Sequence, residues 1–252
     1  MISNIDEYTN FPLFNALKDL NDEMINANMP KVEINVVGGF ALMLHNLRDK
    51  DDDRTDIDYI GAPLPTQLRD IVNNISIKNH LVKDWLNNDL MLTGTTLKDL
   101  EYSTGELHFL PAFELEKIKV NVLETKDLLR MKMIAIDSSI TAIDDGGEFT
   151  RHKDLKDIMT LSNKLGIQLS DLNKIYGKYL INENTTSIIQ TYAEKGMQAV
   201  DLQLKKLRFI ALDKQIEEME HSVDKDIYTR SPLIDSVLNK AMARAKSMNE
   251  ER

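Results

Sequence analysis

The pattern of apolar and polar positions is most informative between residues 32 and 60. Residues 32–37 carry β-branched apolar side chains at most positions, which predicts a buried strand. Gly38 and Gly39 follow, and residues 40–47 contain no helix breaker, which predicts a helix. Residues 56–60 alternate acidic and apolar side chains before a final isoleucine, which predicts a second strand. The segment therefore predicts a strand, a glycine turn, a helix and a strand, in that order.

Other segments of the N-terminal half show both helical and extended periodicity. Apolar residues recur at helical spacing over residues 11–29, 66–77 and 80–87, and the single tryptophan, Trp85, is expected to pack in the core. Residues 107–110 and 118–122 have extended patterns. Together these elements predict an α+β fold in which helices flank a small mixed β-sheet.

Beyond residue 124 the pattern is largely helical. Thr125 is a suitable N-cap for the first of these helices. Residues 169–180, 185–220 and 232–248 then show helical periodicity with abundant lysine and glutamate. We therefore expect residues 1–124 to form a core domain and residues 125–252 a helical domain. In structural terms alone, this helical domain could be a dimerisation bundle.

Composition limits the classes of protein to which the chain can belong. Hydrophobic residues make up 42% of the sequence, charged residues 29%, and the net charge of −10 argues against a surface that grips nucleic acid throughout. Local basic clusters between Lys117 and Lys132 and at residues 151–153 leave room for contact with a phosphate or polyanion. The absence of cysteine excludes disulfides and thiolate metal sites. Without a long apolar run or a secretory leader, we expect a cytoplasmic location.

The candidate chemistry lies at the two glycines and at the acidic pair Asp56 and Asp58. Residues two apart on a strand project from the same face, so these carboxylates would repel each other unless a cation lay between them. Magnesium suits such a pair, and the open glycine turn with the following helix start would favour phosphate. The pattern predicts a metal-assisted nucleotidyl-transfer site. Alternatively, Gly38 and Gly39 form only a turn, and the acids are solvated.

A second set of candidates lies further along the chain. Lys132 lies beside a stripe of apolar residues at helical spacing, so it either snorkels from a packed face, which periodicity favours, or reaches toward a phosphate. Asp154 and Asp157 are three residues apart and would share a helix face, although Asp157 could instead pair with Lys153. The stripe consists of Leu129, Met133, Ile136 and Ile140.

Two glycines, a helix and then Asp-x-Asp, in this order, give the chain a clear family resemblance. Over residues 32–60, and less closely over 120–160, it resembles the nucleotidyltransferase superfamily of DNA polymerase β, and within it the AbiEii-type toxin nucleotidyltransferases. The resemblance implies transfer of a nucleoside monophosphate from an NTP. It also implies Mg²⁺ or Mn²⁺ held by Asp56 and Asp58, and a helical domain that embraces the second substrate.

The resemblance also implies roles for individual residues. Gly38, Gly39, Arg54, Thr55 and Lys132 would bind the nucleotide. Asp154 would be the third acidic residue, acting at the metal or as the base. Asp157 remains an alternative third carboxylate, and in many members that group comes from a later strand, where Glu106, Glu114 or Glu116 could supply it. The acceptor would be the end of a tRNA, a protein or a small molecule, and a toxin would imply an antitoxin partner.

The chain departs from the family pattern at three points. Gly39 stands where many members have a serine that contacts a terminal phosphate. An acidic run occupies residues 49–53, close to the expected metal pair. Arg54 and Thr55 precede the acidic pair one residue closer than is common. These departures keep open a second reading, in which the chain is a degenerate, non-catalytic module of the same fold that binds a nucleotide or a partner protein.

Overall fold

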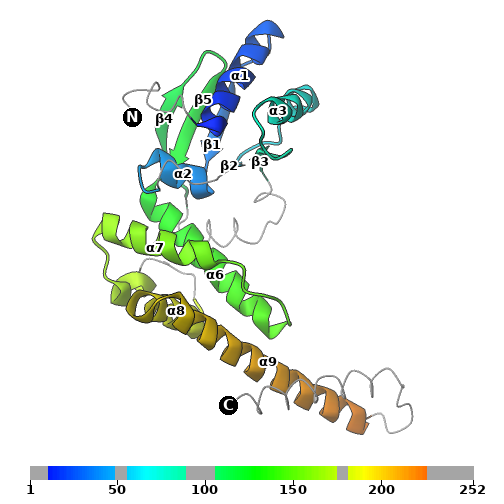
Figure 1. Cartoon of the computed structure of the whole chain (residues 1–252), viewed down its shortest axis with the longest axis vertical. Helices are drawn as coiled ribbons and strands as arrows, with labels where there is room; N and C mark the ends of the chain where they lie inside the picture. Colours follow the sequence, from blue (N-terminus) through cyan, green and yellow to red (C-terminus); the bar gives the residue numbers. More distant parts are fainter. Residues whose placement is uncertain (1–10, 49–55, 89–105, 175–180, 226–252) are drawn as a thin grey trace. The chain divides into compact units, whose positions relative to one another are not determined.

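The computed structural model describes residues 11–48, 56–88, 106–174 and 181–225 of the 252. Within these residues one mixed sheet is formed, with strand order β3-β2-β1-β5-β4 (Figure 1). The presence of this sheet with flanking helices confirms the predicted α+β fold. The strands are β1 (Val32–Val36), β2 (Ile57–Ile60), β3 (Leu86–Asn87), β4 (Phe109–Glu114) and β5 (Ile118–Leu123).

β1 is the central strand, and its pairing decides which parts of the chain meet. It runs antiparallel to β2 and parallel to β5, so that Val36 is in register with Tyr59 on one side and Val122 on the other. Because β1 and β5 run in the same direction, the carboxyl ends of both strands lie at the same end of the sheet. Gly38, which follows β1, therefore lies at this end of the sheet, and α6 (Thr125–Asp144), which follows β5, begins there.

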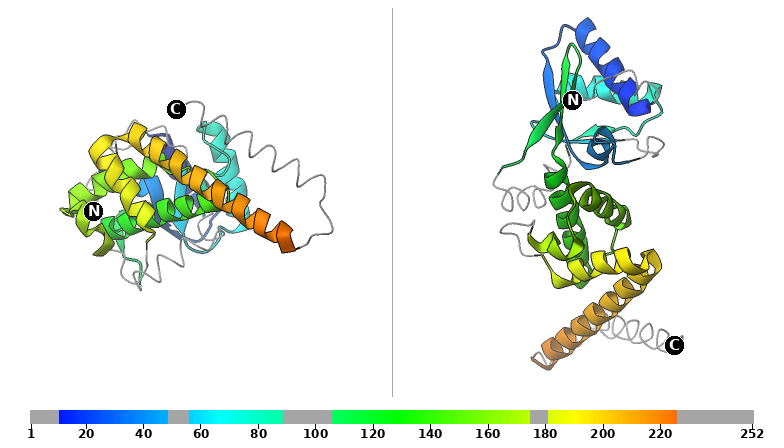
Figure 2. Two further views of the ribbon diagram at one scale, coloured as in Figure 1. Left: turned by 90° about the horizontal axis from the view of Figure 1, so that it is seen from below. Right: turned by 90° about the vertical axis from the view of Figure 1, so that its left-hand side faces the viewer.

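Helices α1 (Pro12–Asn26) and α3 (Thr66–Lys78) cover one face of the sheet (Figure 2, right-hand view). The apolar side of α1 is buried, and the rings of Phe14 and Phe113 from β4 pack with their centroids 5.1 Å apart. On the same face of β1, Ile34 is 1% exposed. Burial of this apolar surface is the main term that stabilises the sheet and its two helices.

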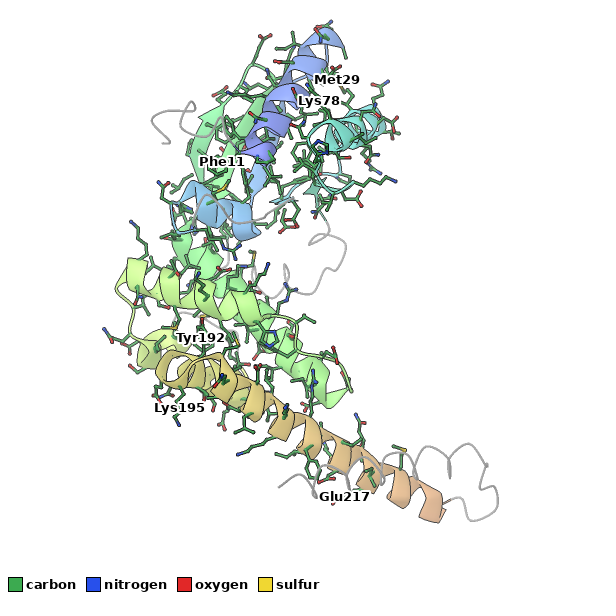
Figure 3. All side chains as sticks on the ribbon, in the orientation of Figure 1. Phe11, Met29, Lys78, Tyr192, Lys195 and Glu217 are labelled. Atoms are coloured by element: carbon green, nitrogen blue, oxygen red, sulfur yellow. The ribbon has the colours of Figure 1, made fainter. Side chains whose placement is uncertain are left out.

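Two polar contacts fix the position of α3. Trp85 is fully buried and donates from Nε1 to the Val72 carbonyl at 3.0 Å, which confirms its predicted core position. At the C-terminal end of α3, Lys78 (labelled in Figure 3) pairs through Nζ with Asp19 of α1 at 2.7 Å. The opposite face of the sheet carries polar side chains, among them Asn35 and Asn121, which are joined by a 2.9 Å hydrogen bond.

The contacts of the chain divide it into two compact units. The first contains Met1–Ile136 and Lys153–Ile181, and the second contains Asp137–His152 and Asn182–Arg252. The first unit thus includes the beginning of α6 and nearly all of α7, beyond the expected domain boundary at residue 124. No helix within the described ranges is both long and apolar enough to cross a bilayer. The remaining helices are α2 (Gly38–Leu44), α7 (His152–Leu165), the 3₁₀ helix η2 (Leu169–Lys174), α8 (Glu183–Lys195) and α9 (Met197–Lys225).

Some helix predictions are corrected by the structure. Residues 80–87 do not form a helix: the chain turns and enters β3, because the Ile57 amide bonds to the Trp85 carbonyl and draws this segment to the sheet. The predicted helix over residues 185–220 is two helices, since Gly196 at φ 76° interrupts it. Thr125, expected as an N-cap, is the first residue of α6. Predictions for residues 89–104, 175–180 and 232–248 lie outside the described residues.

Candidate active site

The candidate site brings the Asp58 carboxylate close to the backbone of Gly38. Gly38 has φ of 66°, a conformation that L side chains rarely adopt. A Cβ built on Gly38 would lie 2.6 Å from Asp58 Oδ2, closer than real Cβ atoms approach. The backbones are also joined here, since the Val37 amide donates to the Asp58 carbonyl at 2.9 Å. Only glycine therefore leaves room for the Asp58 carboxylate at this turn.

The two acidic residues of the motif lie on either side of a buried isoleucine. Ile57 is fully buried and Tyr59 is 3% exposed, whereas Asp56 and Asp58 are half-buried. Because side chains alternate across a strand, Asp58 projects from the face opposite to Ile57. This is the polar face of the sheet, which also carries Asn35. Asp56 directly precedes β2, at the position from which alternation directs a side chain to the same face.

The helix after the glycine turn is shorter than predicted. It begins at Gly38, two residues early, and ends at Leu44, and all seven of its residues are buried. So short a helix has a small dipole, so a phosphate contact would depend on single backbone amides at the turn. The ring of His45 lies at its C-terminal end, where Nε2 donates to the Leu123 carbonyl of β5 at 2.8 Å. This bond connects the C-terminal end of α2 to the end of β5, where α6 begins.

A buried cluster of four charged side chains joins the end of α2 to α6 and α7. Lys132 Nζ contacts an Asp154 carboxylate oxygen and lies 3.0 Å from Asp157 Oδ2. The Arg48 guanidinium binds the same Asp157 at two points, with Nε 3.0 Å from Oδ1 and Nη2 against Oδ2. The four side chains are only 5–9% exposed. We refer to Arg48, Lys132, Asp154 and Asp157 as the charge cluster.

The charge cluster corrects two of the alternatives that the sequence left open. Lys132 does not snorkel to solvent: its ammonium is buried and held between two carboxylates of α7. Asp157 pairs with Lys132 and Arg48, which replaces the suggested pairing with Lys153. Asp154 and Asp157 do share a helix face, as their spacing predicts, and that face points to Lys132.

The electrostatics of the charge cluster favour the ionised form of Asp157. Burial on its own would raise the pKa of the Asp157 carboxyl group. The nearby Lys132 charge and the Arg48 hydrogen bonds outweigh that effect and hold the pKa of Asp157 below its usual range. Asp157 therefore remains a carboxylate at neutral pH and keeps its two cationic partners in place.

The remaining candidates are distributed differently. Arg54, Thr55 and the acidic run at residues 49–53 lie outside the described residues. Glu106 is exposed in the segment before β4. Glu114 is in register with Lys119 near the start of β5, and Glu116 lies in the adjoining turn. The last two are thus at the end of the sheet opposite to Gly38, which does not suit a third carboxylate for Asp58.

Two interactions near the site were not predicted from the sequence. Arg48 precedes an acidic run and carries no pattern that separates it from a solvated cation. Asp127, in the first turn of α6, is 1% exposed and accepts hydrogen bonds from the His108 amide at 3.0 Å and from His108 Nδ1 at 3.1 Å. Arg130 also donates to it at 3.0 Å. Its helical spacing to Arg130 was the one signal available in the sequence.

A separate pocket of about 290 Å³ lies at the β2–β3 edge of the sheet. Tyr59, Arg69, Asp84 and Asn88 are among its lining residues, and the buried Asn88 Nδ2 atom has no hydrogen-bond partner among the residues that the structure describes. Tyr59 belongs to the face of β2 opposite to Asp58. Of the predicted candidate residues that the structure describes, none lines this pocket.

The donor set at Asp56 and Asp58 suits a hard divalent cation. Carboxylate oxygens are preferred magnesium ligands, and magnesium commonly takes only one or two of them, with water and substrate phosphates in its other positions. Gly38 keeps side-chain atoms out of the space beside Asp58, which such a shared ion requires. Among the described residues, no three histidine, aspartate or glutamate side chains gather into a metal site. A fit therefore rests on the acidic pair together with a bound substrate.

All the described candidate residues belong to the first compact unit. Gly38, Gly39, Asp56, Asp58 and the charge cluster come from segments that are far apart in the sequence, and the fold groups them in one unit. Comparisons with protein-family models, curated proteins and solved structures found no match.

Proposed function

We propose that the chain is a metal-dependent nucleotidyltransferase of the polymerase-β-like superfamily. The observation that carries the proposal is the 2.6 Å separation between a Cβ built on Gly38 and Asp58 Oδ2. This separation places Asp58, the second acid of the Asp-x-Asp motif, against the glycine turn that precedes it in the family pattern. In this superfamily the glycine turn and the acidic pair together bind a nucleoside triphosphate. The short distance between them therefore favours a nucleotide site over a turn with a purely structural role.

In the proposed reaction an acceptor oxygen forms a bond to the α-phosphorus of an NTP. The bond from that phosphorus to the bridging oxygen breaks, and pyrophosphate leaves with the electron pair. The proton of a hydroxyl acceptor passes to a base. The products are a nucleotidylated acceptor and pyrophosphate, so the step needs no oxidant or reductant.

Asp56 and Asp58 would hold the divalent cation, either Mg²⁺ or Mn²⁺. When bound, such an ion neutralises triphosphate charge and activates the attacking oxygen. The amide groups at Gly38 and Gly39 would donate to phosphate oxygens, because no side chain blocks their approach. Lys132 would supply positive charge to the phosphates.

Asp154 has two possible roles, and its contact with Lys132 favours one of them. Its carboxylate is buried and bonded to the Lys132 ammonium. A carboxylate held in this way sets the position and charge of the lysine. We therefore assign Asp154 first to holding Lys132, and second to accepting the proton of the acceptor.

The acceptor class and partners are also proposals. The toxin-like branch of the superfamily suggests the end of a tRNA, with the helical region of the chain holding this second substrate. A protein side chain or a small molecule would use the same chemistry. If the chain acts as a toxin, a separate antitoxin protein would be its partner.

A labelling assay tests the proposal directly. The full chain is incubated with Mg²⁺, each α-³²P-labelled NTP in turn, and either total tRNA or a cell lysate. The Asp56→Asn and Asp58→Asn variants retain side-chain size but lose charge, and Glu116→Gln serves as the matched control because it lies at the other end of the sheet. We expect label transfer that falls more than about 100-fold in either aspartate variant, a loss typical of removing a group that stabilises developing charge.

The outcomes separate the proposed enzyme from its alternative. Transfer by the wild type and the Glu116→Gln variant, with loss in both aspartate variants, supports the enzyme. Magnesium-dependent nucleotide binding without transfer to any acceptor supports the non-catalytic module. If the wild type neither binds nucleotide nor transfers label, the proposed function is wrong.

A further inference from the structure

The charge cluster has a balance that bears on the proposed nucleotide site. Among its four members, two are cations and two are carboxylates, so they sum to zero. Lys132 contacts both carboxylates, whereas Arg48 binds both oxygens of Asp157. A planar guanidinium matches a carboxylate at two points, which makes this the most directional contact in the cluster.

Removal of Arg48 alone would change the charge that a phosphate meets. Lys132 would then face two buried carboxylates without the Arg48 guanidinium, and the summed charge of the cluster's own members would fall from 0 to −1. Because these groups are 91% or more buried, solvent screens them little. An incoming triphosphate would be repelled, and the Lys132 ammonium would stay bound to α7.

We propose that Arg48 is a positioning residue of the nucleotide site, which neutralises Asp157 so that the Lys132 charge is available to the triphosphate. This inference rests on the proposed function, because it concerns the same lysine. Arg48 acts through Asp157 and Lys132 and need not touch the substrate. It gives the loop after α2 a role in nucleotide affinity that its sequence does not suggest.

The charge balance makes a prediction that a purely structural contact does not. Arg48→Gln leaves excess negative charge and should weaken binding of Mg²⁺–NTP by about 10- to 100-fold, because it removes one positive charge from a buried cluster where solvent screening is weak. Asp157→Asn leaves excess positive charge and should tighten binding by a similar factor. The double variant Arg48→Gln/Asp157→Asn restores the wild-type charge of the cluster and should bind within about threefold of the wild type, because its two charge changes are equal and opposite.

The experiment is equilibrium binding of a fluorescent ATP analogue with Mg²⁺ to the full chain at two salt concentrations. Each variant is first checked for a folded thermal transition, and Arg208→Gln, at an exposed arginine of α9, is the control. If Arg48→Gln does not fold, the comparison of Asp157→Asn with the double variant still measures the effect of the arginine. Arg48→Lys, which keeps the charge but loses the two-point contact, should lie between wild type and Arg48→Gln.

Three results separate the two proposals. The affinity order Asp157→Asn, then wild type with the double variant, then Arg48→Gln supports the inference. Weaker binding in both single variants and no recovery in the double variant would show that the contact only holds the fold together, and would leave the proposed function intact. If the wild-type chain binds no nucleotide and transfers no label, both proposals are overturned.

Discussion

The position of the Asp58 carboxylate requires glycine at residue 38: a Cβ there would lie 2.6 Å from Asp58 Oδ2. Gly38 also has φ of 66°, and this backbone conformation alone should make Gly38→Ala destabilise the fold by about 1–2 kcal/mol. The substitution should also displace the Asp58 carboxylate. A displacement near 1 Å at a reacting centre can cost about 100-fold in rate. Urea unfolding and the label-transfer assay measure the two effects separately.

The matched control for this variant is Gly166→Ala. Gly166 has φ of 65°, almost the value at Gly38, and a Cβ there would meet nothing within 4 Å. The two alanine variants should lose similar stability, and only Gly38→Ala should lose activity in addition. Equal activity in the two variants would contradict the role given to Asp58.

The buried carboxylate of Asp157 should make stability depend on pH in the acid range. Because its folded pKa is depressed, the native state binds fewer protons than the unfolded state between the folded pKa and the usual value for aspartate. Its contribution to stability is therefore complete above about pH 4 and is lost as pH falls through the folded pKa. Urea unfolding of the wild type at a series of pH values should show this loss.

Asp157→Asn should remove that dependence and lower stability at neutral pH by about 3 kcal/mol, since it removes the carboxylate that both Arg48 and Lys132 bind. The difference between wild type and variant should stay constant from pH 7 to 5 and shrink below about pH 4. Asp70→Asn, at an exposed acid of α3, is the control and should change stability by less than about 0.5 kcal/mol. A difference that does not depend on pH would refute the assignment.

Asp127 should be a structural anchor between β4 and α6. Its buried carboxylate accepts from the His108 amide, from His108 Nδ1 and from Arg130. Asp127→Asn should lower the free energy of unfolding by about 2 kcal/mol, because these bonds to a charged acceptor are weakened. Chemical denaturation measures the change, with Asp145→Asn as an exposed control. A loss below about 0.5 kcal/mol would show that the anchor contributes little.

Trp85 should report on the integrity of the sheet unit. It is the single tryptophan, it is fully buried, and its Nε1 donates to the Val72 carbonyl at 3.0 Å. Its native emission should be blue-shifted and poorly quenched by acrylamide, and both properties should change on unfolding. Trp85→Phe should lose the signal and about 2 kcal/mol of stability, through one hydrogen bond and a smaller ring. Strong quenching in the native state would place the indole near solvent.

The sequence by itself determined the local elements of this protein. The β-branched run at residues 32–37, the two glycines and the alternation at residues 56–60 follow from local backbone preferences and side-chain spacing, so strand, turn and strand were predictable. That Asp154 and Asp157 share one helix face followed from their spacing in the same way. Residues 80–87 were mistaken for a helix because a short apolar run does not distinguish a helix from an edge strand.

Only the tertiary structure decided which of these elements meet. The approach of Asp58 to Gly38 depends on the antiparallel pairing of β1 with β2, and Arg48 and Asp157 are 109 residues apart in the chain. Periodicity assigned Lys132 to a packed face but not to a partner, and the fold supplied Asp154 and Asp157. The physical reason is that local propensity acts over a few residues, whereas pairing of buried charges depends on how distant helices and strands pack.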